Sequence, residues 1–296
     1  MRLTLIAACL TLLLIAPARS QTARLPIDVV AAENFYGDVA GQIGGVDVHV
    51  TSVLSNPDQD PHLFEVSPSI ARALSAARIV VYSGIDYDPW MAKLLGATRS
   101  GATRSGERQV IVVADLVGRK SGDNPHIWYD PATMLACARA LAAALDADDP
   151  AHTGGYDQRL AGFAASIAPI QARIAALRQR LAGTPVTATE PVFGYMFEAL
   201  GLQVRNLPFQ IAVMNGTEPS ASDVATFETD LRTHAVQLLV YNAQASDPIA
   251  QRMELLAKAS HVPVIGAAET EPPGKTYQAW MMAELDAVAN ALPPRR

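Results

Sequence analysis

A helical stretch of about thirty residues, 151–181, constrains the fold of this chain more than any other feature. It is rich in Ala, Leu, Arg and Gln. A helix of that length spans on the order of 45 Å, which is long for an element packed inside one lobe. The stretch therefore predicts a strut that joins two lobes, with a kink or a local break at Pro169.

Strand and helix patterns alternate on both sides of this strut. The segment VDVHVTSVL (46–54) is typical of a strand, and Ser67 before Pro68 marks the start of the helix that follows. In the second half, LQVRNL (202–207) and VPVIGAA (262–268) are predicted strands between helical segments. Such alternation predicts an α/β fold: two lobes with mostly parallel sheets, joined by one long rigid helix.

The first twenty residues differ from the rest of the chain. MRLTLIAACLTLLLIAPARS has an early Arg2, an apolar core and a small-residue end, which is the pattern of a secretory signal peptide. Cys9 lies too early in the apolar run to be a lipid-modified cysteine, and no later segment is expected to span a membrane. We therefore expect an exported, soluble periplasmic protein without a lipid anchor. Its expected parts are a signal peptide (1–20), an N-terminal lobe (21–150), a connecting helix (151–182) and a C-terminal lobe (183–296).

Charge and cysteine content narrow the function. The formal net charge is −6 and no polybasic run exists, which argues against nucleic acid as a partner. The two cysteines are Cys9 and Cys137, so cleavage of the leader leaves one and no disulfide can form. A metal site in this chain must therefore use histidines and carboxylates rather than thiolates. We expect the protein to be a monomer.

Polar residues that directly follow predicted strands are the candidates for a site. His62 and His126 follow strands of the first half, Glu190 follows PVTAT in the second half, and Glu269 and Glu271 follow PVIGAA. Ligands of open α/β sheets bind beyond the carboxyl ends of the strands. If the halves face each other, two imidazoles and two carboxylates converge in the cleft between the lobes.

Such a set of side chains suits a divalent first-row transition metal. A proline precedes each histidine and restricts the backbone of its loop, which helps to preorganise the site. Three nearby acids, Asp60, Glu65 and Asp130, are candidates to accept hydrogen bonds from the N–H groups of the metal-binding imidazoles.

The motifs around these residues resemble those of a known family. DPHLFEVSPS, NPHIWYDP, ATEPVFGYMFEALGL and PVIGAAETEPPG are similar to stretches of the periplasmic metal-binding proteins of ABC importers. These are the cluster A-I zinc and manganese solute-binding proteins (ZnuA-, TroA- and PsaA-like), and the resemblance covers essentially the whole mature chain. It implies two α/β lobes joined by a rigid helix, with a metal site between them.

The resemblance also implies roles for particular residues. His62 and His126 match the first two ligands, and Glu190 matches the third, which is His in typical zinc members and Glu in several manganese members. The fourth ligand of the family is an acid eight residues after a strand proline, which gives Glu271, with Glu269 as the alternative. The implied function is capture of a divalent metal and its delivery to an ABC transporter membrane permease, without enzymatic chemistry.

The nature of the ligands bears on the metal. Two carboxylates favour Mn²⁺ or Fe²⁺, whereas intrinsic affinity favours Zn²⁺ at almost any site of nitrogen and oxygen ligands, so both Mn²⁺ and Zn²⁺ stay open. Two other functions are alternatives to metal capture for an importer. A secreted metal-dependent hydrolase needs an open coordination position and a nearby base, and no HExxH motif or nucleophile elbow occurs. A metal chaperone or adhesin-like surface protein would share the fold.

Overall fold

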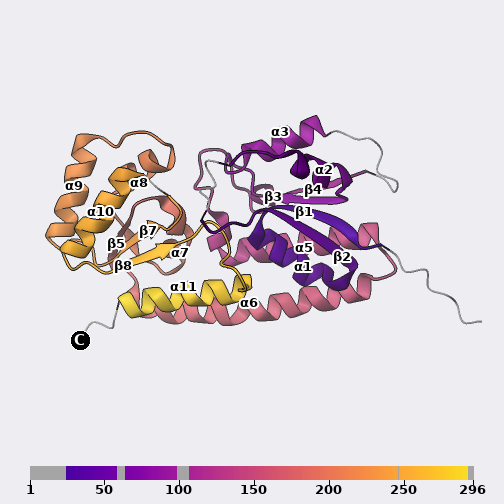
Figure 1. The fold of residues 1–296 in the computed structure, drawn as a ribbon. Helices are drawn as coiled ribbons and strands as arrows, with labels where there is room; N and C mark the ends of the chain where they lie inside the picture. Colours follow the sequence, from indigo (N-terminus) through magenta and orange to yellow (C-terminus); the bar gives the residue numbers. More distant parts are fainter. Residues whose placement is uncertain (1–24, 59–63, 99–106, 246, 293–296) are drawn as a thin grey trace, which may run out of the picture.

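The computed structural model describes residues 25–58, 64–98, 107–245 and 247–292. The predicted signal peptide and the residues Asp60 and His62 lie outside the described residues. Two four-stranded sheets, all of whose pairings are parallel, form two lobes (Figure 1). The predicted fold class is confirmed.

The N-terminal sheet has the order β2-β1-β3-β4. Alternate residues of β1 point to opposite faces: Val29 and Ala31 join the main core, whereas Val30 and Ala32 join a smaller cluster under α2 and α3. The sheet is therefore covered on both sides. Its elements are β1 (Ile27–Glu33), α1 (Asn34–Gly44), β2 (Val48–Leu54), α2 (Pro68–Ala76), β3 (Ile79–Tyr82), α3 (Pro89–Ala97), β4 (Gln109–Val112), α4 (Val113–Leu116) and α5 (Pro131–Asp148).

The C-terminal sheet repeats this arrangement, with the order β6-β5-β7-β8. Its outer face packs on α8, α9 and α10, where Phe209 and Phe227 meet edge to face with centroids 4.7 Å apart. The elements are β5 (Pro185–Ala188), α7 (Gly194–Ala199), β6 (Gln203–Val204), α8 (Leu207–Met214), α9 (Ala221–Arg232), β7 (Leu239–Asn242), α10 (Pro248–Ala259), β8 (Val264–Ala267) and α11 (Tyr277–Ala291).

One predicted strand of this lobe is shorter than expected. The segment 202–207 forms only the two-residue strand β6, because Asn206 takes a left-handed conformation (φ 60°) and α8 begins at Leu207 with Pro208 in its first turn. Elsewhere in the chain, helices begin after residues whose side chains commonly cap a helix N-terminus. Asp130 caps α5 by accepting from the N–H of Ala132, and Ser220 caps α9 by accepting from the N–H of Asp223.

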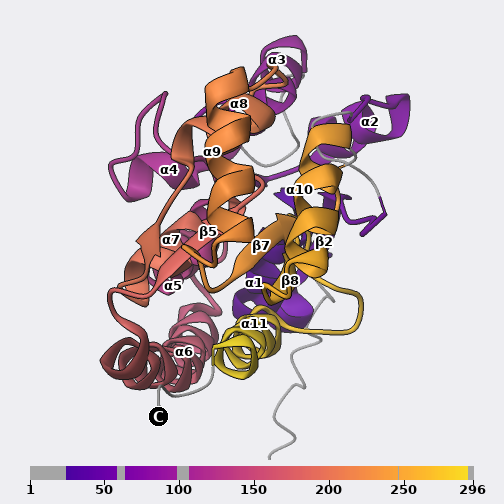
Figure 2. The same ribbon diagram turned by 90° about the vertical axis from the view of Figure 1, so that its left-hand side faces the viewer.

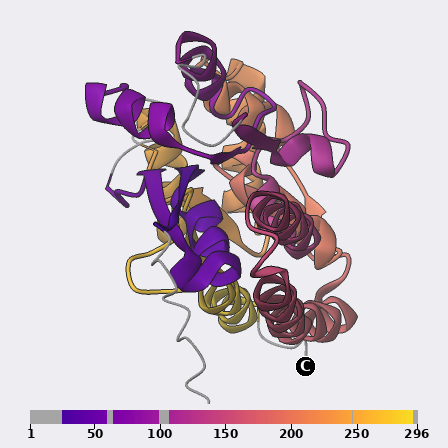
Figure 3. The same cartoon turned by 90° about the vertical axis from the view of Figure 1, so that its right-hand side faces the viewer.

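The long helix is α6 (Thr153–Leu181), and it runs beneath both lobes (Figure 1). Its 29 residues correspond to about 44 Å. The last helix, α11, lies beside it, as Figures 2 and 3 show end on, and Arg173 of α6 pairs with Asp286 of α11 at 2.7 Å. Buried residues of both lobes and both helices form one continuous core. The long helix that joins the lobes is therefore flanked by α11 along part of its length.

Two expectations about α6 are corrected. The helix is continuous through Pro169, so the local break, one of the two alternatives expected there, does not occur; Pro169 lies on the exposed face, where water can hydrate the carbonyl group that loses its partner. By length and composition α6 also qualifies as a membrane span, contrary to the expectation for the segments after the leader. In its most apolar window 22 % of the residues are buried, and Phe163, Ile167 and Ile170 are among the α6 residues in the protein core.

Candidate metal centre

His126 lies in the loop before α5 and is fully buried. Asn124 Oδ1 accepts hydrogen bonds from the backbone N–H of His126 (3.1 Å) and from its ring Nδ1 (2.6 Å). The amide group of Asn124 is oriented by its Nδ2, which donates to the carbonyl of Pro191 at 2.7 Å. Because Oδ1 can only accept, Nδ1 carries the proton of the neutral ring, and the lone pair is left on Nε2.

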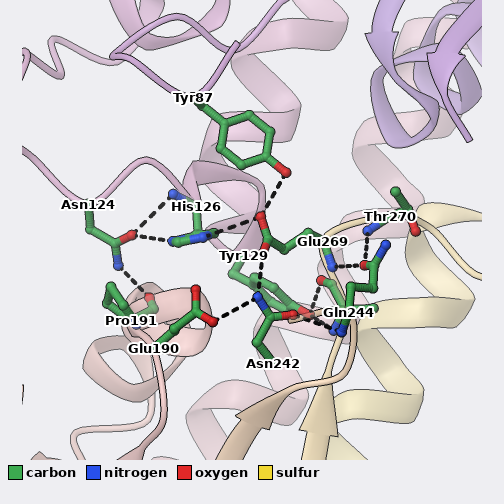
Figure 4. Close-up of polar contacts among 11 residues, drawn as sticks. Tyr87, Asn124, His126, Tyr129, Glu190, Pro191, Asn242, Gln244, Glu269 and Thr270 are labelled. Carbon is green, nitrogen blue, oxygen red and sulfur yellow. Dashed lines mark hydrogen bonds and ion pairs between the residues drawn. The ribbon is translucent and has the colours of Figure 1, made fainter. Parts of the chain in front are cut away.

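Glu269 faces this lone pair from the opposite lobe (Figure 4). It follows β8 and is fully buried, and its Oε2 lies 3.6 Å from Nε2 of His126. The same oxygen accepts from the hydroxyl of Tyr87 at 2.9 Å, and the other accepts from Nδ2 of Asn242. Burial and the charge of Glu269 raise the pKa of Tyr87 well above its usual range, which keeps the hydroxyl protonated as a donor.

Glu190 enters the same region from the end of β5 and is 3 % exposed. Its Oε1 accepts from Nδ2 of Asn242 at 3.3 Å, so Asn242 is hydrogen bonded to both Glu190 and Glu269 (Figure 4). Asn242 is the last residue of β7. The carboxyl ends of three parallel strands therefore bring these side chains together.

The arrangement has the chemistry of an incomplete metal site. Within the described ranges, no three His, Cys, Asp or Glu side chains already form a group that could hold an ion. A lone pair on His126 and a carboxylate on Glu269 nevertheless face each other in a buried region at 3.6 Å. Nitrogen and oxygen ligands of a tetrahedral zinc ion lie about 3.3 Å from each other, so a cation between these atoms fits and relieves their repulsion.

Glu271 lies on a different side of its loop. Its backbone N–H donates to Oδ1 of Asn34 (2.8 Å), and its carbonyl accepts from Nδ2 of Asn34 (2.7 Å). Burial, and then the nearby charge of Asp38, raise the pKa of Glu271 to about 8. The structure thus places Glu269 beside His126 and Glu190, and places Glu271 against α1.

The residues expected around the ligands are placed as follows. Asp130 uses its carboxylate to cap α5, and the ring of His126 is held by Asn124 instead. Glu65 is exposed to solvent. His62 and Asp60 belong to residues 59–63, outside the described part of the chain.

Three residues of the site were missed by sequence reasoning: Tyr87, Asn124 and Asn242. Asn242 had a usable signal, because it stands at the end of a predicted strand just as Glu190 does. Asn124 stands directly before the Pro-His pair that drew attention to His126. Tyr87 had no such signal, since its role depends on the approach of Glu269 from the other lobe.

Comparison with known proteins agrees with this geometry. Over 310 aligned residues the chain is 22 % identical to the high-affinity zinc uptake system protein ZnuA of Paracoccus denitrificans (91 % of this chain, 90 % of that protein). It is 26 % identical over 132 residues to the manganese-binding lipoprotein MntA of Bacillus subtilis (44 % and 43 %). Its fold matches the periplasmic zinc-binding protein TroA of Treponema pallidum with a TM-score of 0.73 at 20 % identity (90 % and 98 %).

These relatives are metal-binding and uptake proteins, so the comparisons give no support to the alternative of a secreted hydrolase. The family model described as zinc-uptake complex component A, periplasmic, matches residues 29–291. That range includes both lobes, the connecting helix and every described residue of the site. The chain belongs to this family of periplasmic metal-binding proteins.

Proposed function

We propose that this protein captures a divalent transition metal, Mn²⁺ or Zn²⁺ with Fe²⁺ as a further candidate, and delivers it to an ABC-type membrane permease. The observation that carries the proposal is the pair formed by Nε2 of His126 and Oε2 of Glu269, both buried, 3.6 Å apart and contributed by opposite lobes. The metal is cargo, so the protein needs to bind and release it without further chemistry.

The ligands that we propose are His62, His126, Glu190 and Glu269. Glu269 is preferred to Glu271 because Asn242 links it to Glu190 and because it faces His126. Tyr87, Asn124 and Asn242 orient the ligands through hydrogen bonds, as partners around metal sites commonly do. His62 rests on its motif alone.

Two carboxylates among four ligands favour Mn²⁺ more than a site with three imidazoles does, although Zn²⁺ retains the higher intrinsic affinity. Imidazole binds a metal only in its neutral form, so acid weakens capture and favours release. The pair formed by α6 and α11 restricts the lobes, which supports a small rocking motion rather than a wide hinge.

The test is titration of demetallated protein with Mn²⁺, Zn²⁺ and Fe²⁺ by calorimetry. We expect binding of one ion per chain with a dissociation constant in the micromolar range or tighter. Absence of binding for all three ions would refute the proposal. Delivery is tested by reconstituting the protein with its membrane permease in vesicles and measuring uptake of the metal that it binds most tightly.

We further propose that residues 1–20 direct export and are removed without lipid attachment, and that the mature protein is a monomer. N-terminal sequencing of the exported protein should begin near Gln21. Sedimentation analysis should give the mass of a single chain, and a dimer mass would contradict the second part.

A further inference from the structure

Two carboxyl groups are buried together beneath the loop that carries Tyr87. Glu33 ends β1 and is fully buried, and neither of its oxygens accepts a hydrogen bond of good geometry within the described residues. Asp88 precedes α3 and is 1 % exposed, and its carboxylate accepts from the backbone N–H groups of Ser83 (2.7 Å) and Gly84 (2.8 Å). A buried ion without a partner is costly, so this pair requires a proton.

The two carboxyls hold that proton unequally. Burial, and then Asp88, raise the pKa of Glu33 well above its usual range. Burial raises the pKa of Asp88 to about 6, while its backbone hydrogen bonds act in the opposite direction. The raised pKa of Glu33 places the shared proton on Glu33, and the Asp88 carboxylate accepts from the two backbone N–H groups.

No cation compensates this pair among the described groups that act on it. The titratable side chains that face Glu33 or Asp88 all carry raised pKa values and are neutral at pH 7; they are Tyr36, Tyr82, Tyr87 and Cys137. Ser83 is also close, and its hydroxyl is hydrogen bonded to Tyr36 at 3.1 Å. Further protonation of the pair therefore removes its only charge.

The loop above the pair needs this charge to keep its shape. Gly84, Ile85 and Asp86 all have positive φ values (77°, 45° and 65°), a conformation that is unfavourable for the β-branched Ile85. Asp88 closes the loop through the N–H groups of Ser83 and Gly84. Tyr87 lies between Asp86 and Asp88 in this loop. Its ring packs on Trp128 with centroids 4.9 Å apart, and its hydroxyl donates to Glu269.

We propose that Glu33 and Asp88 form a proton-sharing pair that positions Tyr87 on the ligand Glu269, so that uptake of a second proton by the pair weakens metal binding. The inference rests on the proposed function. When Asp88 becomes neutral it accepts more weakly from the two backbone N–H groups, the loop relaxes, and Tyr87 no longer holds Glu269. Metal release in acid then has a component that lies outside the ligands.

The test compares Asp88→Asn with the wild type by Zn²⁺ titration of the full mature chain from pH 5 to pH 8. The ratio of their dissociation constants cancels the protonation of the ligands themselves. We expect the variant to bind about tenfold more weakly at pH 7.5, and the ratio to approach one at pH 5, where Asp88 is neutral in both proteins. A ratio that does not change with pH overturns the inference.

Two further variants separate positioning from general damage. In a Tyr87→Phe background, Asp88→Asn should add no further loss, because Asp88 acts through Tyr87; an additive loss overturns the inference. Glu33→Gln keeps a donor to Asp88 and should retain the affinity at pH 7.5, whereas Glu33→Leu should lose it. Equal losses in both Glu33 variants would contradict proton sharing.

A measurement without metal distinguishes failure of this inference from failure of the proposed function. If the wild type binds no metal, the proposed function fails while the pair can still be tested. Hydrogen exchange of the Ser83 and Gly84 amides in the metal-free protein, corrected for the intrinsic rate, should accelerate below pH 6 in the wild type and be fast at every pH in Asp88→Asn. If the protection of these two amides in the wild type does not change across this pH range, the inference that Glu33 and Asp88 share a proton is wrong.

Discussion

Nε2 of His126 lies 3.6 Å from Oε2 of Glu269, and both side chains are completely buried although they belong to different lobes. The loop of His126 is fixed by Asn124, and that of Glu269 by Gln244, whose Oε1 accepts from the N–H groups of Glu269 (2.6 Å) and Thr270 (3.1 Å). A cation between these atoms joins the lobes at a point opposite the base formed by α6 and α11.

Metal binding should therefore stabilise the whole chain. At free Zn²⁺ or Mn²⁺ of one hundred times the dissociation constant, the free energy of unfolding should increase by about 2.7 kcal/mol. Calorimetry should show a melting temperature higher by about 5 °C. Mg²⁺ at the same concentration is the control, because it prefers oxygen ligands and octahedral geometry and should give no shift. An equal shift with Mg²⁺ would indicate nonspecific binding to surface acids.

The choice between the two acids of the last loop can be tested directly. Glu269→Gln removes the carboxylate that faces His126 and, if Glu269 is the ligand, should weaken metal binding by about 100-fold or more. Glu271→Gln is the matched control two residues away, and it should change the dissociation constant by less than about threefold. Titration of both variants decides the assignment, and the opposite order of effects would make Glu271 the ligand.

Asn124 offers a test of how the imidazole is oriented. Asn124→Ala leaves Nδ1 of His126 without its acceptor and should weaken metal binding by about 10- to 100-fold. Asn124→Asp keeps the acceptor oxygen but loses the donor to the carbonyl of Pro191, so it should retain most of the affinity. Similar losses in the two variants would show that the bond to Pro191, rather than the ring orientation, matters.

Much of this arrangement could be predicted from the sequence because strand ends fix it. The rule that ligands gather beyond the carboxyl ends of parallel strands correctly brought His126, Glu190 and the last loop to one place. The start of α2 at Pro68, with Ser67 at the N-cap position, followed equally directly from local sequence. Such features depend only on residues close together in the chain.

Features that depend on distant contacts could not be predicted. The course of the last loop is set by Asn34 of α1 and by Gln244, which bind its backbone groups while Glu269 faces His126. The pairing of α11 with α6 likewise depends on Arg173 and Asp286, which are distant in sequence. A local sequence pattern does not indicate which residues from distant parts of the chain will contact a loop.

Glu190 should control the preference among metals. Replacing its carboxylate with an imidazole by Glu190→His makes the site softer, which should raise the affinity for Zn²⁺ relative to Mn²⁺ by at least about tenfold. Glu198→His is the control, because Glu198 is exposed on α7 in the same segment. Competition titrations with the two ions measure the ratio. An unchanged ratio in Glu190→His would contradict the role of carboxylates in selectivity.

The helical base should show its own pH dependence. Burial raises the pKa of Glu284 on α11 to about 7, although the indole N–H of Trp280 and the charge of Lys275 act against the shift. An unfolded Glu titrates near pH 4.3, so the folded protein holds a proton that the unfolded chain loses between about pH 4.3 and 7. The contribution of Glu284 to the free energy of unfolding is therefore fully present below pH 4.3 and is lost as the pH rises through 7.

In Glu284→Gln the side chain stays neutral at every pH, and its amide oxygen can still accept a hydrogen bond from the indole N–H of Trp280. At pH 8 the variant should be more stable than the wild type by about 1–2 kcal/mol, and the difference should disappear near pH 4.5. Urea denaturation of the metal-free protein at the two pH values measures this difference. Asp157→Asn, at an exposed position of α6, is the control and should give the same small difference at both. If Glu284→Gln is less stable than the wild type at pH 8, the ionised carboxylate stabilises the base through its bond to Trp280 and contact with Lys275.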